Sequence, residues 1–143
     1  MRTAEIRPDQ DILSPESDTK PGDIYFHCDR SSMLSLYPNP HKKTSYSCIG
    51  VNAGSKIEIE AIHSEDPNWV KIKPQHENSR PNDNQWVYLP NLQPNWIRCT
   101  RSNKELGVER AKKLLYDKEI HCRKEDSQTK VRNLILEALD NVI

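Results

Sequence analysis

A stretch of alternating apolar and charged residues in the middle of the chain constrains the fold more than any other feature. Ile57, Ile59 and Ala61 fall on one face of an extended strand, and the charged residue before each of them falls on the other. This two-residue period is typical of a strand with one buried face. Shorter alternations follow at 69–73 and 85–89, each with a tryptophan at or next to its start. Strands this short are not stable alone, so they predict a small closed or nearly closed sheet.

Further short segments on either side of this stretch are rich in the residues that strands favour. Turn residues separate them, and Pro38 ends one of them because proline has no amide proton for a strand ladder. We expect strands at 24–28, 33–37, 46–51 and 96–99. The polar residues 1–21 are expected to form a flexible arm, the polar residues 74–84 a long loop, and residues 22–101 the β-rich body.

Helical patterns replace strand patterns at Ser102, so we expect a segment of two helices over residues 102–143. Ser102 followed by Glu105 matches a capping box, which favours the start of a helix. That helix would run to about residue 121 and have one apolar side, formed by Val108, Ala111, Leu115 and Cys122.

A second helix is expected from Ser127, whose side chain can cap a helix N-terminus. Its apolar residues recur at three- and four-residue spacings, the pattern of an amphipathic helix. We name them the helix stripe: Val131, Leu134, Ile135, Ala138 and Leu139. Such a stripe must be buried on the β-rich body, on the first helix, or on another chain, which includes a second copy of this one.

Five segments of the β-rich body together resemble the bacterial-type Src-homology-3 (SH3b) family in their order and spacing. They are Leu34–Pro38, Ile49–Gly50, Gly54–Ile59, Trp69–Ile72 and Trp86–Leu89. The resemblance covers residues 23–92. It implies an α+β protein made of a small SH3-like antiparallel β-barrel, followed here by two C-terminal α-helices.

Small barrels of this kind bind extended or proline-rich peptides on shallow aromatic ridges. The aromatic residues expected to line such a face are Tyr37, Trp69, Trp86, Tyr88 and Trp96. Adjacent strand residues point to opposite sides. An inward Val70 would therefore leave Trp69 near the surface, and an inward Val87 would leave Trp86 outside. Alternatively, these rings fill the core of a chain that has one phenylalanine.

The leading hypothesis is a non-catalytic protein–protein interaction module, or a small subunit of a larger assembly. It would hold a peptide or protein surface through the barrel aromatics, the helix stripe, or both. We expect neither a cofactor nor a metal.

The charge balance argues against nucleic acid as the main partner, because 21 basic residues match 21 acidic ones and phosphate-binding surfaces usually carry a basic excess. A single-stranded nucleic-acid barrel is the third choice, using the tryptophans with Lys71, Lys73, Arg98, Arg101 and Lys104. No apolar run approaches the roughly 18 residues of a membrane span, and the start of the chain lacks the apolar segment of a secretory signal. A cytoplasmic protein with no membrane partner is therefore expected.

The second choice is a zinc-binding or thiol-chemistry protein. His27–Cys28 and His121–Cys122 are two His-Cys pairs, and Cys48 and Cys99 are further thiols. Adjacent ligands on a strand diverge, which disfavours zinc. A Cys48 nucleophile would need a base such as His27 or His63. The carboxylates of Glu58 and Glu60 could pair in principle, but a solvated strand face accounts for them better.

Overall fold

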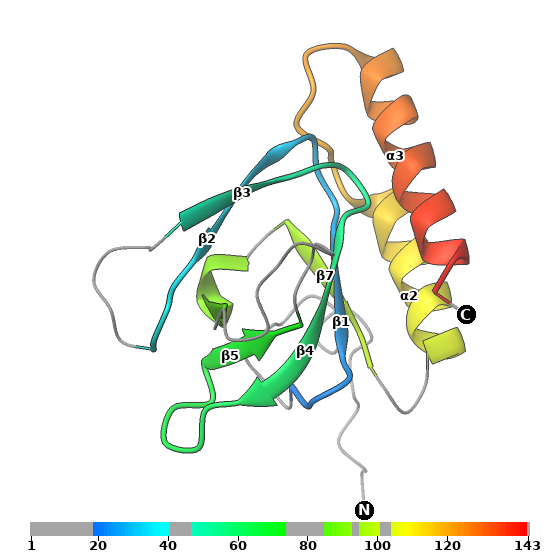
Figure 1. Cartoon of the computed structure of the whole chain (residues 1–143). Coiled ribbons are helices and arrows are strands. Elements are labelled where there is room, and N and C mark those ends of the chain that lie inside the picture. Colours follow the sequence, from blue (N-terminus) through cyan, green and yellow to red (C-terminus); the bar gives the residue numbers. More distant parts are fainter. Residues whose placement is uncertain (1–18, 41–46, 74–84, 93–94, 101–103, 143) are drawn as a thin grey trace, which may run out of the picture.

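The computed structural model describes residues 19–40, 47–73, 85–92, 95–100 and 104–142. Within them, a five-stranded antiparallel sheet of order β6-β5-β4-β1-β7 and a two-stranded hairpin, β2–β3, precede two helices (Figure 1). The α+β class is confirmed, and each expected strand is present. The strands are β1 (Ile24–His27), β2 (Ser32–Leu36), β3 (Ser47–Val51), β4 (Lys56–Ile62), β5 (Trp69–Ile72), β6 (Trp86–Tyr88) and β7 (Trp96–Cys99).

Strands β1 and β7 lie between two apolar cores, which is why every residue of both is buried. Ile24 and Phe26 face a core shared with the helices, which we name the helix-side core. Tyr25 faces a core shared with the other strands, which we name the strand-side core. Ile97 and Trp96 divide in the same way on β7. Figure 1 shows the helices on one side of the sheet. The helices therefore complete the hydrophobic interior of the β-rich body.

A bulge in β4 changes which of its residues faces the core. Ile59 is opposite Ile72, but Ala61 is opposite Lys71, so the pairing shifts between Ile59 and Ala61. Such a bulge inserts one residue and reverses the inward and outward sides beyond it. Ile57 and Ile59 point inward as predicted, but Ile62, rather than Ala61, packs against the core beyond the bulge.

The two helices are α2 (Lys104–Asp117) and α3 (Glu125–Asp140). The prediction that Ser127 caps the second helix is wrong: Lys124 is the N-cap, and Glu125 and Asp126 form an acidic first turn that suits the helix dipole. Cys122 lies in the connection after α2, where it still packs against the helix-side core. None of the helices in the described part of the chain has the length and apolar character to span a bilayer.

The helix stripe is mostly buried within its own chain. Ile135 and Leu139 are fully buried in the core shared with β1, β7 and α2, and Val131 packs against that core. Ala138 is half-buried, and Leu134 remains 54% exposed. The structure therefore shows the stripe packed against the chain's own β-rich body and first helix.

The hairpin β2–β3 meets the five-stranded sheet through one isolated bridge, between Tyr37 and Trp86. No ladder joins β3 to β7 within the ranges given above, so complete closure of a barrel remains a prediction. The expected loop at 74–84, the capping Ser102 and the arm up to residue 18 lie outside the described residues. Thr19, at the start of the described chain, hydrogen-bonds to the hydroxyl of Tyr25 at 2.5 Å and accepts from buried Arg98 at 3.3 Å.

Candidate functional site

Four of the five predicted aromatic residues come together on neighbouring strands. We define the aromatic cluster as Tyr37, Trp69, Trp86 and Tyr88 with His63. The ring centroids of Trp69 and Tyr37 are 5.1 Å apart in an edge-on arrangement, and those of Trp69 and Tyr88 are 5.0 Å apart. Both separations lie in the favourable range for aromatic pairs.

Two backbone pairings position the rings of the cluster. Trp69 on β5 is opposite Tyr88 on β6. Tyr37, directly after β2, exchanges two backbone hydrogen bonds with Trp86, both 2.9 Å. These ladders place the rings by strand register, so the shape of the cluster is set before a ligand arrives.

His63 was not predicted as part of this face. Its ring lies 5.9 Å from the Trp86 ring, nearly at right angles. Its Nδ1 atom accepts hydrogen bonds from the backbone N–H groups of Glu65 at 3.3 Å and Asp66 at 3.1 Å. The turn therefore fixes the orientation of the imidazole. The sequence gives no periodic signal for His63, because the residue lies just beyond the strand alternation.

Two expectations about the aromatic face are wrong. Trp69 is 6% exposed, because Tyr37 and Tyr88 cover the side of β5 that was expected to meet solvent. Trp96 is 5% exposed in the strand-side core, where its ring lies 5.1 Å from that of His27. Trp69 is thus the base of the cluster, and Trp96 is a core residue outside it.

On β6, the predicted alternation of inward and outward side chains is observed. Val87 and Leu89 are buried, at 1% and 0% exposure, and Trp86 and Tyr88 are half-buried beside them. Tyr37 is also half-buried. The cluster therefore presents the accessible parts of three large rings above a buried tryptophan, an arrangement suited to stacking against apolar or planar groups of a ligand.

The metal and thiol alternatives gain no support from the described residues. No group of three or more His, Cys, Asp or Glu side chains there is arranged to hold a metal ion. Both ring nitrogens of His27 are hydrogen-bonded, to the Asn52 carbonyl oxygen and the Ser32 hydroxyl. Burial raises the pKa of the Cys28 and Cys99 thiols to about 12, which keeps both protonated and unreactive at neutral pH.

The basic residues proposed for nucleic acid do not form an open surface. Arg98 is 1% exposed and hydrogen-bonds to Thr19. Lys71 pairs with Glu60 at 3.4 Å, and Lys73 pairs with Glu58. Glu58 and Glu60 thus act as ion-pair partners on the exposed face of β4. Arg101 lies outside the described residues.

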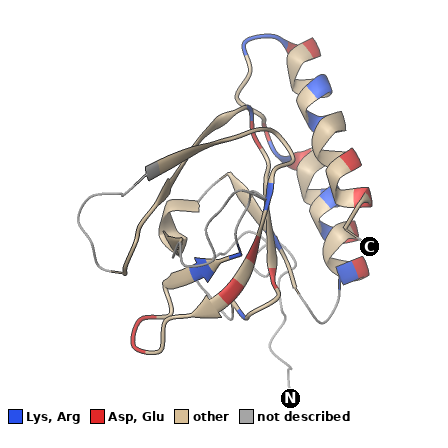
Figure 2. Ribbon diagram, viewed as in Figure 1, with Lys and Arg blue, Asp and Glu red and all other residues tan. Residues whose placement is uncertain are grey.

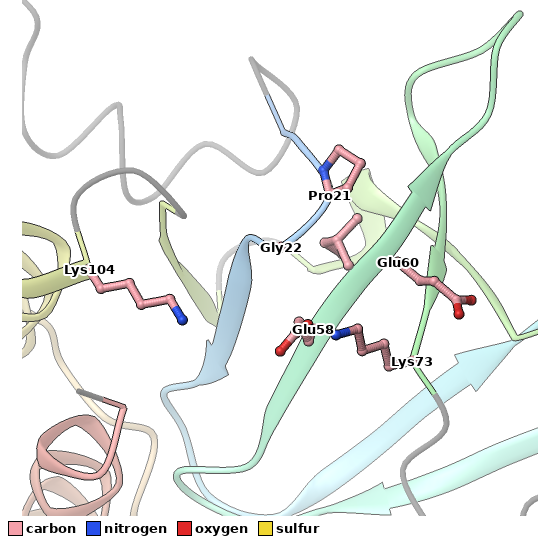
Figure 3. Close-up of a pocket in the computed structure, with 7 residues that line it drawn as sticks. Pro21, Gly22, Glu58, Glu60, Lys73 and Lys104 are labelled. Atoms are coloured by element: carbon pink, nitrogen blue, oxygen red, sulfur yellow. Dashed lines mark ion pairs between the residues drawn. The ribbon is translucent and has the colours of Figure 1, made fainter.

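A cleft of about 360 Å³ adjoins these ion pairs (Figure 3). Gly22, Ile59 and Lys104 contribute to its lining with the paired Glu58 and Lys73. Figure 3 shows the Lys104 side chain extending from the start of α2 toward this space. With acidic and basic groups neutralising each other, the cleft offers no concentrated charge for a ligand.

Comparison with protein-family models, with curated proteins and with solved structures finds no match for this chain. The class of protein is therefore defined by the architecture itself: an α+β protein whose strand-rich part is backed by two C-terminal helices. The resemblance to the SH3b family remains a prediction from the five sequence segments.

Proposed function

We propose that this protein is a non-catalytic interaction module that binds an extended, proline-containing peptide of a partner protein through the aromatic cluster. The observation that carries the proposal is the grouping of half-buried Tyr37, Trp86 and Tyr88 over buried Trp69. Rings held at fixed positions lose little entropy on binding, and proline-rich peptides are already close to the extended conformation that such ridges accept.

The aromatic cluster is a better candidate than the helix stripe. Ile135 and Leu139 of the stripe are used inside the chain, so a partner could not reach the most buried part of the stripe without opening the core. We also propose a reducing, cytoplasmic location, because Cys28, Cys48, Cys99 and Cys122 are all free thiols.

The test is an array of proline-containing peptides probed with the full chain, followed by titration of the best binder. Trp86→Ala should weaken binding by about thirtyfold, the effect of a hot-spot residue worth about 2 kcal/mol. Tyr116→Ala is the matched control, because Tyr116 is an aromatic residue on α2 that is 66% exposed and lies outside the cluster.

Thermal unfolding of each variant establishes that the fold survives. The proposal fails if no peptide on the array binds. It also fails if the Trp86→Ala and Tyr88→Ala variants bind the peptide with the same affinity as the unchanged chain.

A further inference from the structure

The outer edge of β2 carries backbone groups that no strand in the described structure uses. Tyr37, which continues β2, points both its N–H and its C=O toward Trp86 on β6. The two groups of one strand residue lie on the same side, and the side alternates at each residue. The backbone groups of Ser35 and Met33 therefore point to the same side as those of Tyr37, away from β3.

The local sequence explains why β6 does not pair with this edge. After the Tyr37–Trp86 bridge, β6 ends at Tyr88 and the chain turns into the 3₁₀-helix η1 (Leu89–Leu92), which contains Pro90. Proline has no amide proton and disfavours continuation of a ladder. The strands therefore separate from this bridge onward, and residues of η1 line a space beside the edge of β2.

The separation leaves a groove of about 380 Å³. Residues 32–35 of β2 form one side, and Asn91, Leu92, Asn95 and Trp96 contribute the other. Figure 1 shows the short η1 coil alongside β2. The Tyr37–Trp86 bridge follows two residues after Ser35, the last β2 residue that lines the groove.

The groove is polar but uncharged. None of its lining residues is ionisable, and Figure 2 shows β2 and β3 without acidic or basic colour. Leu34 and Leu92 are buried at its base. The side-chain oxygen of Asn95 is buried without a hydrogen-bond partner within the described structure, an unfavourable state for an acceptor. The N–H and C=O groups along the outer edge of β2 have no strand partner in the described structure. A peptide backbone supplies partners of both kinds.

We propose that this groove binds an uncharged, extended peptide segment of a partner protein, which adds as a strand to the free edge of β2. Residues 33 to 35 span roughly 7 Å, so the pairing involves a core of about three peptide residues. Their N–H and C=O groups bond to the backbone groups of Met33 and Ser35. The proposal stands on the open edge of β2 and is independent of the aromatic cluster.

A selection of random hexapeptides displayed on phage, with the full chain as bait, supplies the probe. Recovered peptides are synthesised and titrated by fluorescence polarisation. Ser35→Pro removes the outward N–H without removing a β3 hydrogen bond, and should weaken binding by about tenfold or more. Ser35→Ala, which keeps the backbone groups, should bind like the unchanged chain.

A second measurement uses the unchanged chain, in case Ser35→Pro does not fold. N-methylation of alternate peptide amides should abolish binding in one register and spare it in the other, the signature of strand pairing. The proposal is overturned if no peptide is recovered, if N-methylation has no effect, or if Trp86→Ala rather than Ser35→Pro removes binding. A concentration-dependent dimer that Ser35→Pro dissolves would also overturn it, since the occupant would then be a second copy of the chain.

Discussion

His27 joins three parts of the chain through a ring that is fully buried. Its Nδ1 donates to the carbonyl oxygen of Asn52 at 3.1 Å, and its Nε2 accepts from the hydroxyl of Ser32 at 3.0 Å. The ring also packs beside Trp96. A proton added at Nε2 would remove the acceptor for Ser32 and place a charge between β1 and the strand-side core.

Stability should therefore decrease at mildly acidic pH. Burial lowers the pKa of His27 below 6.5, with Lys118 acting in the same direction and the Asn52 carbonyl and Asp29 opposing it. Between the folded and unfolded pKa values the unfolded chain binds more protons, so the free energy of unfolding rises with pH there and reaches its full value above 6.5. Urea unfolding from about pH 5 to 8 measures this effect.

His27→Gln should flatten the pH dependence in that range, and His121→Gln, at an exposed position, should leave it unchanged. A dependence that survives His27→Gln, or a chain that becomes more stable on acidification, would contradict the assignment.

Trp69 shows where prediction from the sequence stops at this scale. Alternation correctly placed Val70 in the core, and therefore placed Trp69 on the opposite side of β5. It could not reveal that Tyr37 and Tyr88 cover that side, because their approach depends on register between separate strands. Likewise, the free groups of Ser35 follow from the bridge at Tyr37, which no local pattern predicts.

Helix α3 shows the same division between pattern and packing. Its apolar spacing predicted an amphipathic helix, and Ile135 and Leu139 are its fully buried residues. The contact that seats it was not predictable: at Gly54, where φ is 83°, a Cβ atom would lie 2.9 Å from the Cβ of Ala138. The turn before β4 therefore needs glycine both for its conformation and for the close approach of α3.

Adjacent residues of α3 should differ sharply when replaced by alanine. Ile135→Ala removes a fully buried side chain from the helix-side core and should reduce the free energy of unfolding by about 2–5 kcal/mol. Leu134→Ala, 54% exposed, should change it by less than about 0.5 kcal/mol. Chemical denaturation measures both, and equal losses would mean that α3 does not dock as described.

Across the whole molecule, β1 and β7 belong to two cores at once, so the β-rich body and the helices share their interior. The change in composition at Ser102 is visible in the sequence, but the shared interior is not. Apolar residues on both faces of β1 indicate that both faces are buried, but they do not indicate which elements cover each face. Disruption of the helices should therefore expose the sheet as well.

The four thiols should report this cooperativity. Cys48 is exposed and should react first with an aromatic disulfide reagent, whereas Cys28 and Cys99 are buried in the helix-side core. Because both side chains are fully buried, they should react only from the open state of the protein, at a rate set by the population of that state. Mass spectrometry of labelled peptides resolves the sites, and Cys48→Ser should remove the fast phase. Labelling of Cys28 at the rate of Cys48 would show that the helices detach separately.

The position of β1 between β4 and β7 determines when folding can finish on the ribosome. Of the strands in the described residues, β1 is made first, and β7, the partner for its second edge, is made last. Until β7 and both helices have left the exit tunnel, the nascent protein carries an unpaired strand edge and an uncovered apolar face, the features that promote misassociation. Its native structure is therefore reached only after β7, α2 and α3 have all emerged.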